Sequence, residues 1–257
     1  MWWLATLPPV LLLSTQATVL DTSCYVLAAG PGSPCLVLDP GAGAADAVQP
    51  LIEANALVPV AVAATHGHAD HIWDAAAVSE RWGVPFLLGE PDLDRLDDPA
   101  SFLGPAFAAA FVSMTDAPWQ RPEAVQPLPA GKLARSVPDL GLDIDLLAAP
   151  GHTPGSTIFL VHETPSAESV VPPSIRRTLP DTGVVAVTGD VLFAGSVGRV
   201  DLPGGDGLTM KATLRELREA IPQEAWVLPG HGPSSTMEWE LVQNPYLNAR
   251  WLASGSF

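Results

Sequence analysis

Short apolar runs alternate with segments of helical periodicity along most of the chain. Several of these runs end at a glycine-containing turn; the clearest are residues 58–64, 146–149, 184–188 and 225–228. β-Branched and apolar runs with such boundaries predict buried strands. By contrast, residues 208–221 place Met210, Leu214, Leu217 and Ile221 on one helical face and Lys211 elsewhere, which predicts an amphipathic helix on a sheet.

The same patterning predicts an alternating arrangement of strands and helices over most of the remaining chain. We expect three to five strands within residues 1–64, the first of them in the apolar N-terminal stretch, and strands at 84–88 and 156–161. Helices are expected at 44–55 and 70–82, and a surface loop rich in Pro and Ser at 163–183.

Residues 92–129 interrupt this alternation. The segment is rich in Asp and Pro and contains the aromatic residues Phe102, Phe107, Phe111 and Trp119. Two interpretations stay open at this point: a lid or wall of a binding pocket, or a packed helix with long loops.

The strongest chemical signal is Thr65-His66-Gly67-His68-Ala69-Asp70-His71, which directly follows the apolar run 58–64. Half of the six histidines of the chain lie here. Neutral imidazole is a common ligand of zinc-like ions, and Asp adds a charged oxygen donor. Neighbouring side chains diverge, so His66 and His68 can converge on one ion while Asp70 and His71 are better placed for a second. The motif predicts a metal site for two ions.

Further potential ligands follow the other apolar runs. His152 lies in Pro150-Gly151-His152-Thr153-Pro154-Gly155, Asp190 follows Gly189, and His231 lies between Gly230 and Gly232. Glycine allows a sharp turn at a strand end, so the next side chain can point back over the sheet edge. We therefore expect these three residues to join the first cluster.

The pattern formed by His66, His68, Asp70, His71, His152, Asp190 and His231 resembles that of metallo-β-lactamase-fold hydrolases, and within them the glyoxalase II-like (hydroxyacylglutathione hydrolase-like) branch. The resemblance covers residues 20–247 and is supported by segments 23–26, 39–43, 150–155, 189–193 and 198–205. It implies an α/β fold of the αββα type, a four-layer sandwich of two β-sheets flanked by helices, which we expect to form one domain over residues 1–257.

The resemblance also implies the roles of the site residues. His66, His68 and His152 would hold one divalent ion, and Asp70, His71 and His231 a second. Asp190 would bridge both, which makes Asp70 and Asp190 the catalytic carboxylates. The ions are expected to be zinc, with iron or manganese as alternatives. Arg199 is a candidate for substrate binding, in competition with pairing to Asp201 or Asp206. Asp39 is expected to orient a ligand imidazole or to cap a turn, and His162 lies outside every ligand motif.

The implied activity is hydrolysis of a small acyl thioester by a hydroxide shared between two ions. The alternatives are an ester or lactone hydrolase and a persulfide dioxygenase with one iron, which would use only His66, His152 and Asp190. The complete second set of ligands favours the hydrolase.

Composition limits the location and the partners. A formal net charge of −16, with 12 Lys plus Arg against 28 Asp plus Glu, disfavours binding to nucleic acid. The chain lacks an uninterrupted apolar stretch long enough for a membrane span. Cys24 and Cys35 are expected to be buried, reduced side chains rather than a disulfide framework, which suits a cytoplasmic enzyme.

Overall fold

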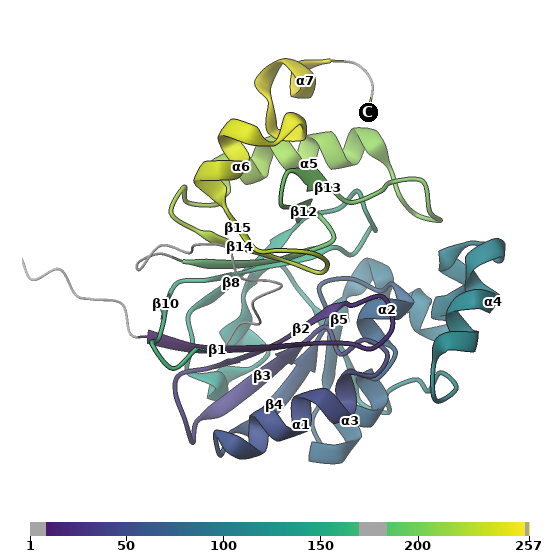
Figure 1. The fold of residues 1–257 in the computed structure, drawn as a ribbon, viewed down its shortest axis with the longest axis vertical. Helices are drawn as coiled ribbons and strands as arrows, with labels where there is room; N and C mark the ends of the chain where they lie inside the picture. Colours follow the sequence, from purple (N-terminus) through teal and green to yellow (C-terminus); the bar gives the residue numbers. More distant parts are fainter. Residues whose placement is uncertain (1–8, 170–183, 255–256) are drawn as a thin grey trace, which may run out of the picture.

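Two β-sheets face each other in the computed structural model, which describes residues 9–169, 184–254 and 257 (Figure 1). Within the described residues, the first sheet has the order β10-β1-β2-β3-β4-β5-β6, and the second has the order β15-β14-β11-β9-β8-β7. The first sheet comprises β1 (Pro9–Gln16), β2 (Ser23–Ala28), β3 (Pro34–Leu38), β4 (Val58–Ala63), β5 (Phe86–Gly89), β6 (Val125–Leu128) and β10 (Thr164–Pro165). The second comprises β7 (Gly131–Lys132), β8 (Ile144–Ala148), β9 (Thr157–Val161), β11 (Val185–Gly189), β14 (Trp226–Pro229) and β15 (Ser235–Thr236). A separate hairpin pairs β12 (Leu192–Phe193) with β13 (Ser196–Val197).

Strand β1 shows why the sequence forms buried sheets. Val10 and Leu12 point into the core between the two sheets, while Leu11 and Leu13 point into the core beneath the helices. A strand buried on both faces needs apolar residues at every position rather than at alternate ones. The continuous apolar runs of the sequence follow from this arrangement.

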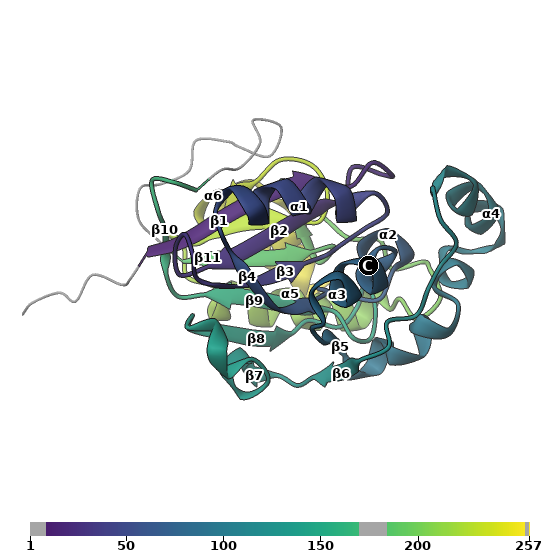
Figure 2. The same cartoon turned by 90° about the horizontal axis from the view of Figure 1, so that it is seen from below.

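Helices cover the outer face of each sheet, which gives four layers (Figures 1 and 2). The first sheet packs against α1 (Ala44–Ala54) and α3 (Ala75–Trp82), and the second against α5 (Gly207–Ala220). Two shorter helices, α6 (Met237–Gln243) and α7 (Ala249–Ala253), lie on the same side as α5. The predicted αββα sandwich is therefore confirmed.

The single helix predicted over 70–82 is wrong, because the structure has α2 (Ala69–Ile72) followed by α3 after a break. The break lies at Asp74, whose carboxylate accepts hydrogen bonds from the backbone N–H groups of Gly43 (2.9 Å) and Ala45 (3.0 Å). Asp74 thus satisfies donors at the start of α1, which have no partner within that helix.

Lys211 differs from its predicted position on the polar side of α5. Its side chain is buried, and its Nζ donates hydrogen bonds to the backbone oxygens of Trp251 and Ser254. The C-terminal segment folds back over α5 and supplies these acceptors, a long-range contact that helical periodicity does not reveal.

The segment 92–129 contains short helices rather than one packed helix. It begins within a 3-10 helix (Glu90–Asp97) and continues with a second 3-10 helix (Pro99–Leu103), α4 (Pro105–Met114) and β6. Further 3-10 helices lie at Leu133–Arg135, Pro138–Leu140 and Pro245–Leu247. Figure 1 shows α4 projecting beside the edge at which the two sheets meet.

Some sequence predictions fall partly outside the described residues. The first strand begins at Pro9 in the structure, and residues 1–8 lie outside the described ranges, as do residues 170–183 of the predicted loop 163–183. Cys24 and Cys35 are both buried and form no disulfide, as predicted. None of the helices in the described residues is long and apolar enough to cross a membrane.

Candidate metal centre

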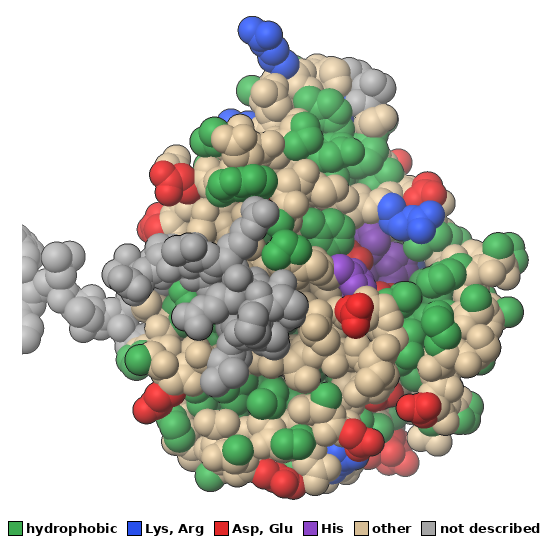
Figure 3. Space-filling model, viewed as in Figure 1, with side chains coloured by type: hydrophobic (Ala, Val, Ile, Leu, Met, Phe, Trp, Pro, Cys, Tyr) green, Lys and Arg blue, Asp and Glu red, His purple; other side chains and the backbone are tan. Residues whose placement is uncertain are grey.

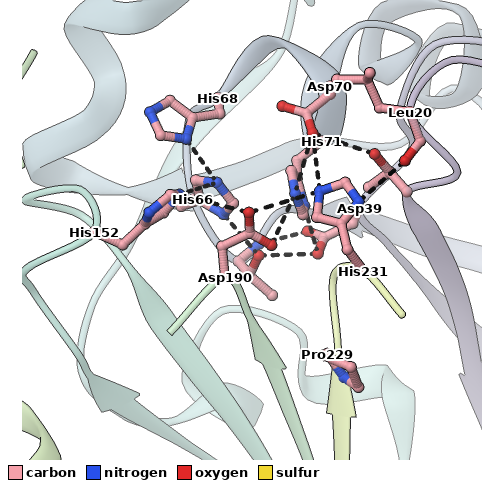
Figure 4. Close-up of polar contacts among 12 residues, drawn as sticks. Leu20, Asp39, His66, His68, Asp70, His71, His152, Asp190, Pro229 and His231 are labelled. Atoms are coloured by element: carbon pink, nitrogen blue, oxygen red, sulfur yellow. Dashed lines mark hydrogen bonds and ion pairs between the residues drawn. The ribbon is translucent and has the colours of Figure 1, made fainter. Parts of the chain in front are cut away.

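The seven predicted ligands gather where the strand ends of both sheets meet (Figure 4). His66 and His68 lie in the turn after β4, and Asp70 and His71 lie in α2, which begins at Ala69. The other three follow strands of the second sheet: His152 after β8, Asp190 after β11 and His231 after β14. Each half of the fold therefore contributes part of the site.

The donor atoms form three overlapping groups. His66, His68 and His152 form one group, and Asp70, His71 and His231 form another; within each group the donor atoms lie within 4.8 Å of one another. We call these the first cluster and the second cluster. The third group joins His66, His71 and Asp190 and links the two.

Asp190 lies between the two clusters. Its Oδ1 is 3.3 Å from Nε2 of His71, and its Oδ2 is 3.7 Å from Nε2 of His152 and 3.6 Å from Nε2 of His231. Oδ2 thus lies near a histidine of each cluster, so the carboxylate is placed to bridge two ions.

The backbone near the centre must approach it closely. A Cβ atom at Gly230 would lie 2.3 Å from Oδ1 of Asp190 and 2.5 Å from Cε1 of His71. Only glycine leaves room at this position, which explains the Pro-Gly-His sequence after β14.

Three imidazoles are oriented through Nδ1, which leaves Nε2 directed at the centre. His152 donates from Nδ1 to the backbone oxygen of Arg199 (2.8 Å), and His231 donates from Nδ1 to that of Leu20 (3.1 Å). His71 Nδ1 lies 3.1 Å from Oδ2 of Asp39. Such partners fix the tautomer and the ring orientation of metal-binding histidines.

Asp39 is fully buried and is itself held in place by Thr65. The backbone N–H of Thr65 donates to Oδ1 (2.6 Å) and its hydroxyl donates to Oδ2 (2.9 Å). Asp39 therefore orients a cluster imidazole, which is one of the two roles considered for it from the sequence.

The donors fit a metal ion better than they fit one another. His68 Nε2, His71 Nε2 and Asp190 Oδ1 are among the buried side-chain atoms of the described residues that complete no hydrogen bond, although the last two lie 3.3 Å apart as an ion pair. Buried polar atoms are normally satisfied, because leaving one unpaired costs roughly 1–3 kcal/mol. Three such atoms at one point, on residue types that bind metals, are explained if ions complete their coordination.

The protonation of the two clusters differs. Burial lowers the pKa of His66 well below its usual value and that of His68 to about 3, so both rings are neutral and able to bind a metal. In His71, burial opposes the charged form, but the carboxylates of Asp190, Asp70 and Asp39 outweigh it and raise the pKa well above its usual value. Burial would raise the pKa of Asp70, yet His71 and His231 lower it to about 2.

The buried pair Asp92 and Arg95 is a structural support that sequence analysis did not identify. Asp92 Oδ2 accepts from the backbone N–H of Gly67 (2.8 Å) and the hydroxyl of Thr153 (2.6 Å), and Oδ1 accepts from the N–H of Gly155 (2.8 Å). These partners flank His66, His68 and His152, so one carboxylate joins both loops of the first cluster.

Arg95 extends this network to a third loop. Its Nε lies 3.2 Å from Asp92 Oδ1, and its Nη2 donates to the backbone oxygen of Pro203 (2.8 Å). The side chains of Asp92 and Arg95 are 0% and 2% exposed. In the sequence, Asp92 is one of several acidic residues in an irregular segment, and no local signal marks it as buried.

Of the two remaining residues considered from the sequence, Arg199 lies at the site and His162 does not. Arg199 lines the cavity in front of the clusters, and its guanidinium pairs with both carboxylate oxygens of Asp201 at 2.7 and 2.8 Å. His162 lies away from the clusters and pairs with Asp145 (2.7 Å). Arg199 therefore borders the site. It also forms the ion pair with Asp201 that the sequence analysis named as the alternative to substrate binding.

The comparisons with known proteins agree with this geometry. The sequence profile of the Metallo-beta-lactamase superfamily matches residues 17–166, more than half of the chain. The chain belongs to this superfamily. An uncharacterized protein from Mycobacterium tuberculosis (strain ATCC 25618 / H37Rv) is 34% identical over 93% of this chain and 98% of its own. The hydroxyacylglutathione hydrolase GloC of Haemophilus influenzae is 29% identical over 83% of this chain and 87% of its own.

Two solved structures show the same architecture. The BLEG-1 B3 metallo-beta-lactamase has a TM-score of 0.68 and 26% identity, over 92% of this chain and 99% of that one. TTHA1623, solved in a di-iron-bound form, has a TM-score of 0.67 and 28% identity, over 91% and 99%. The family and the clusters together define a metal-dependent hydrolase with a histidine-rich site of the dinuclear type.

Proposed function

We propose that this protein hydrolyses acyl thioesters at a centre of two divalent metal ions. The observation that carries the proposal is the convergence of five imidazoles and two carboxylates in linked groups, with buried donor atoms that have no other partner. The likeness to GloC, at 29% identity, supports a thioester as the substrate.

The chain offers a complete set of ligands for each ion. His66, His68 and His152 would hold the first ion, and Asp70, His71 and His231 the second, with Asp190 shared between them. Zinc suits imidazole and carboxylate donors. Iron is the second ion to examine, because TTHA1623 was solved with two iron ions.

Charge within the site favours an anionic transition state. When bound, two divalent ions would supply a hydroxide nucleophile at neutral pH and polarise the substrate carbonyl. Asp70 and Asp190, whose pKa values are lowered against the effect of burial by the surrounding histidines, stay ionised and offset only part of the ionic charge. Asp39 and the carbonyls of Leu20 and Arg199 keep the imidazoles aimed at the centre.

A thioester suits the groups that line the cavity. Hydrolysis adds the oxygen of water to the carbonyl carbon and breaks the carbon–sulfur bond, so the sulfur leaves as a thiolate. A thiol has a pKa of about 8.5, so its anion leaves without a strong proton donor. The acidic side chains among the described lining residues are Asp70 and Asp190. Both face the histidines and remain ionised, so neither carries a proton for the leaving group.

The test is a substrate panel on protein loaded with zinc or with iron, with oxygen consumption recorded in parallel. The panel contains acyl thioesters such as S-lactoylglutathione, a simple ester, a lactone, a β-lactam and glutathione persulfide. We expect thioester cleavage well above cleavage of the ester, the lactone and the β-lactam, without oxygen uptake. Persulfide-dependent oxygen consumption with one iron per chain would contradict the proposal and identify a dioxygenase.

A further inference from the structure

The cavity in front of the clusters has two chemically different sides. It measures about 260 Å³, which is near the lower limit of ordinary ligand pockets. Besides Arg199 and cluster residues, it is lined by Leu20, Leu103, Phe107 and Leu202. In Figure 3, the histidines lie in a hollow with hydrophobic side chains gathered on one side of it.

The apolar side is fixed to the metal centre. Leu103 packs in a small hydrophobic core with Ala69 and Trp73, at the two ends of the α2 segment that carries Asp70 and His71. In α4, Phe111 is fully buried and its ring meets Trp73 edge to face, with the centroids 5.2 Å apart. The wall that carries Leu103 and Phe107 is thus anchored beside the second cluster.

Phe107 is not buried in this small hydrophobic core. It lies in the first turn of α4, lines the cavity and remains 40% exposed. The helix contains no charged residue, and the side chains of Val112 and Met114 on it are 43% and 46% exposed. Of these exposed apolar side chains Phe107 is the one at the cavity, a position that commonly marks a surface for a ligand.

The cavity lining offers little positive charge from side chains. Among the described residues that line the cavity, Arg199 is the one arginine or lysine, and Asp201 occupies its guanidinium with two hydrogen bonds. A substrate chosen mainly through several negative charges would need more cationic groups than this. The lining therefore favours an apolar group over a highly anionic one.

From this lining we infer that the site selects thioesters with an apolar chain beside the scissile carbonyl, and that this chain lies against Leu103 and Phe107. The inference rests on the proposed thioester hydrolysis and specifies the class of substrate. An apolar chain could belong to the acyl group or to the thiol, so the experiment varies each separately.

One series lengthens the acyl group from acetyl to octanoyl on N-acetylcysteamine, and the other lengthens an alkyl thiol from ethanethiol to octanethiol under a constant acetyl group. We expect kcat/KM to rise in one series by up to about fourfold per methylene, the value that corresponds to burial of one CH₂ group, until the cavity is full. The series that responds identifies the part of the substrate that contacts the wall.

The matched variants are Phe107→Ser and Val112→Ser, two apolar-to-hydroxyl changes at exposed positions of α4, of which only Phe107 lines the cavity. Phe107→Ser should flatten the dependence of kcat/KM on chain length, with the largest loss for the longest chains. Phe107→Leu should retain most of this dependence, and Val112→Ser should behave as wild type. Metal content should be equal in all of them.

Equal kcat/KM along both series would overturn this inference while leaving thioester hydrolysis in place. An equal loss of the chain-length dependence in Phe107→Ser and Val112→Ser would do the same. A panel in which no thioester of either series is cleaved would instead overturn the proposed function, and this inference with it.

Discussion

The first and second clusters lie side by side but differ in charge, exposure and support. The first consists of three imidazoles that are only 1–3% exposed, and the Asp92–Arg95 pair joins the loops that carry them. The second contains a carboxylate, has a histidine whose side chain is 30% exposed, and depends on Asp39 for the orientation of His71. The first cluster is the more deeply buried and is neutral, and we call it the closed cluster; the second is the more exposed and is charged, and we call it the open cluster.

This difference indicates that the two clusters hold their ions with different affinity. A closed set of neutral, rigidly held imidazoles is suited to retain an ion, because its ligands need little reorganisation to bind. Both clusters border the cavity, the first with His68 and His152 and the second with Asp70 and His231, and the second also adjoins the apolar wall of α4. We therefore expect the first ion to be bound more tightly and the second to be the one that exchanges.

Removal of the shared ligand should have the largest effect. Asp190→Ala takes away the carboxylate between the clusters, so both ions lose a ligand and their mutual repulsion is no longer offset. We expect loss of hydrolysis and a metal content well below two ions per chain, measured by elemental analysis. The exposed Asp139→Ala variant is the matched control; a variant at Asp190 with two metals and near-native turnover would refute the shared role.

His231→Ala should disrupt the second cluster alone. The variant is expected to retain about one ion per chain and to lose several orders of magnitude in thioester hydrolysis, because the open cluster keeps only Asp70 and His71 of its own ligands. Metal analysis and steady-state kinetics on the same preparation provide the check. Near-native hydrolysis with one ion would show that the second cluster is not required.

Asp92→Asn should weaken the first cluster and the fold together. Breaking a buried ion pair from one side costs about 3–5 kcal/mol, because Arg95 keeps a buried charge. Asp92 bonds residues beside the ligands rather than the ligands themselves, so we expect first-cluster metal affinity to fall by less than the roughly 10–100-fold typical of groups that hydrogen-bond a ligand directly. Chemical denaturation and metal titration measure the two effects, and the double variant Asp92→Asn/Arg95→Met should recover stability without recovering first-cluster affinity.

Asp39→Asn is the corresponding change under the second cluster. It removes the negative charge beside Nδ1 of His71, and we expect second-ion affinity to fall by about 10–100-fold while the first ion is retained. A titration in which Asp39→Asn and Asp92→Asn weaken the same ion would show that the two supports are not separate.

Acid should release the second ion first. Against the effect of burial, neighbouring carboxylates raise the pKa values of His71 and His231, so protons compete with an ion there at a higher pH. Burial lowers the pKa values of His66, His68 and His152, which stay neutral as the pH falls. Metal content measured between about pH 8 and pH 5 should therefore decline from about two ions per chain to about one. Simultaneous loss of both ions would contradict the proposed difference between the first and second clusters.

Much of this arrangement could be predicted from local sequence. The apolar runs predict the strands, and the glycine turns predict that His152, Asp190 and His231 meet His66 at one edge. Both follow from short-range rules, namely the burial of a strand on both faces and the sharp turn that glycine allows.

The supports could not be predicted in this way, because they depend on contacts distant in sequence. Asp92 meets Thr153 across 61 positions, and Lys211 meets Ser254 across 43. Neither polar residue has a periodic or compositional feature that separates it from a solvated one. The break at Asp74 likewise coincides with a distant contact, because its carboxylate accepts from N–H groups at the start of a different helix.

The central claim is that seven side chains hold two ions of unequal affinity. Its most direct test is equilibrium titration of chelator-treated protein with Zn²⁺, with thioester hydrolysis followed at each addition. The account predicts two equivalents in two phases, with most of the activity gained in the second phase. Saturation and full activity at one equivalent would contradict it.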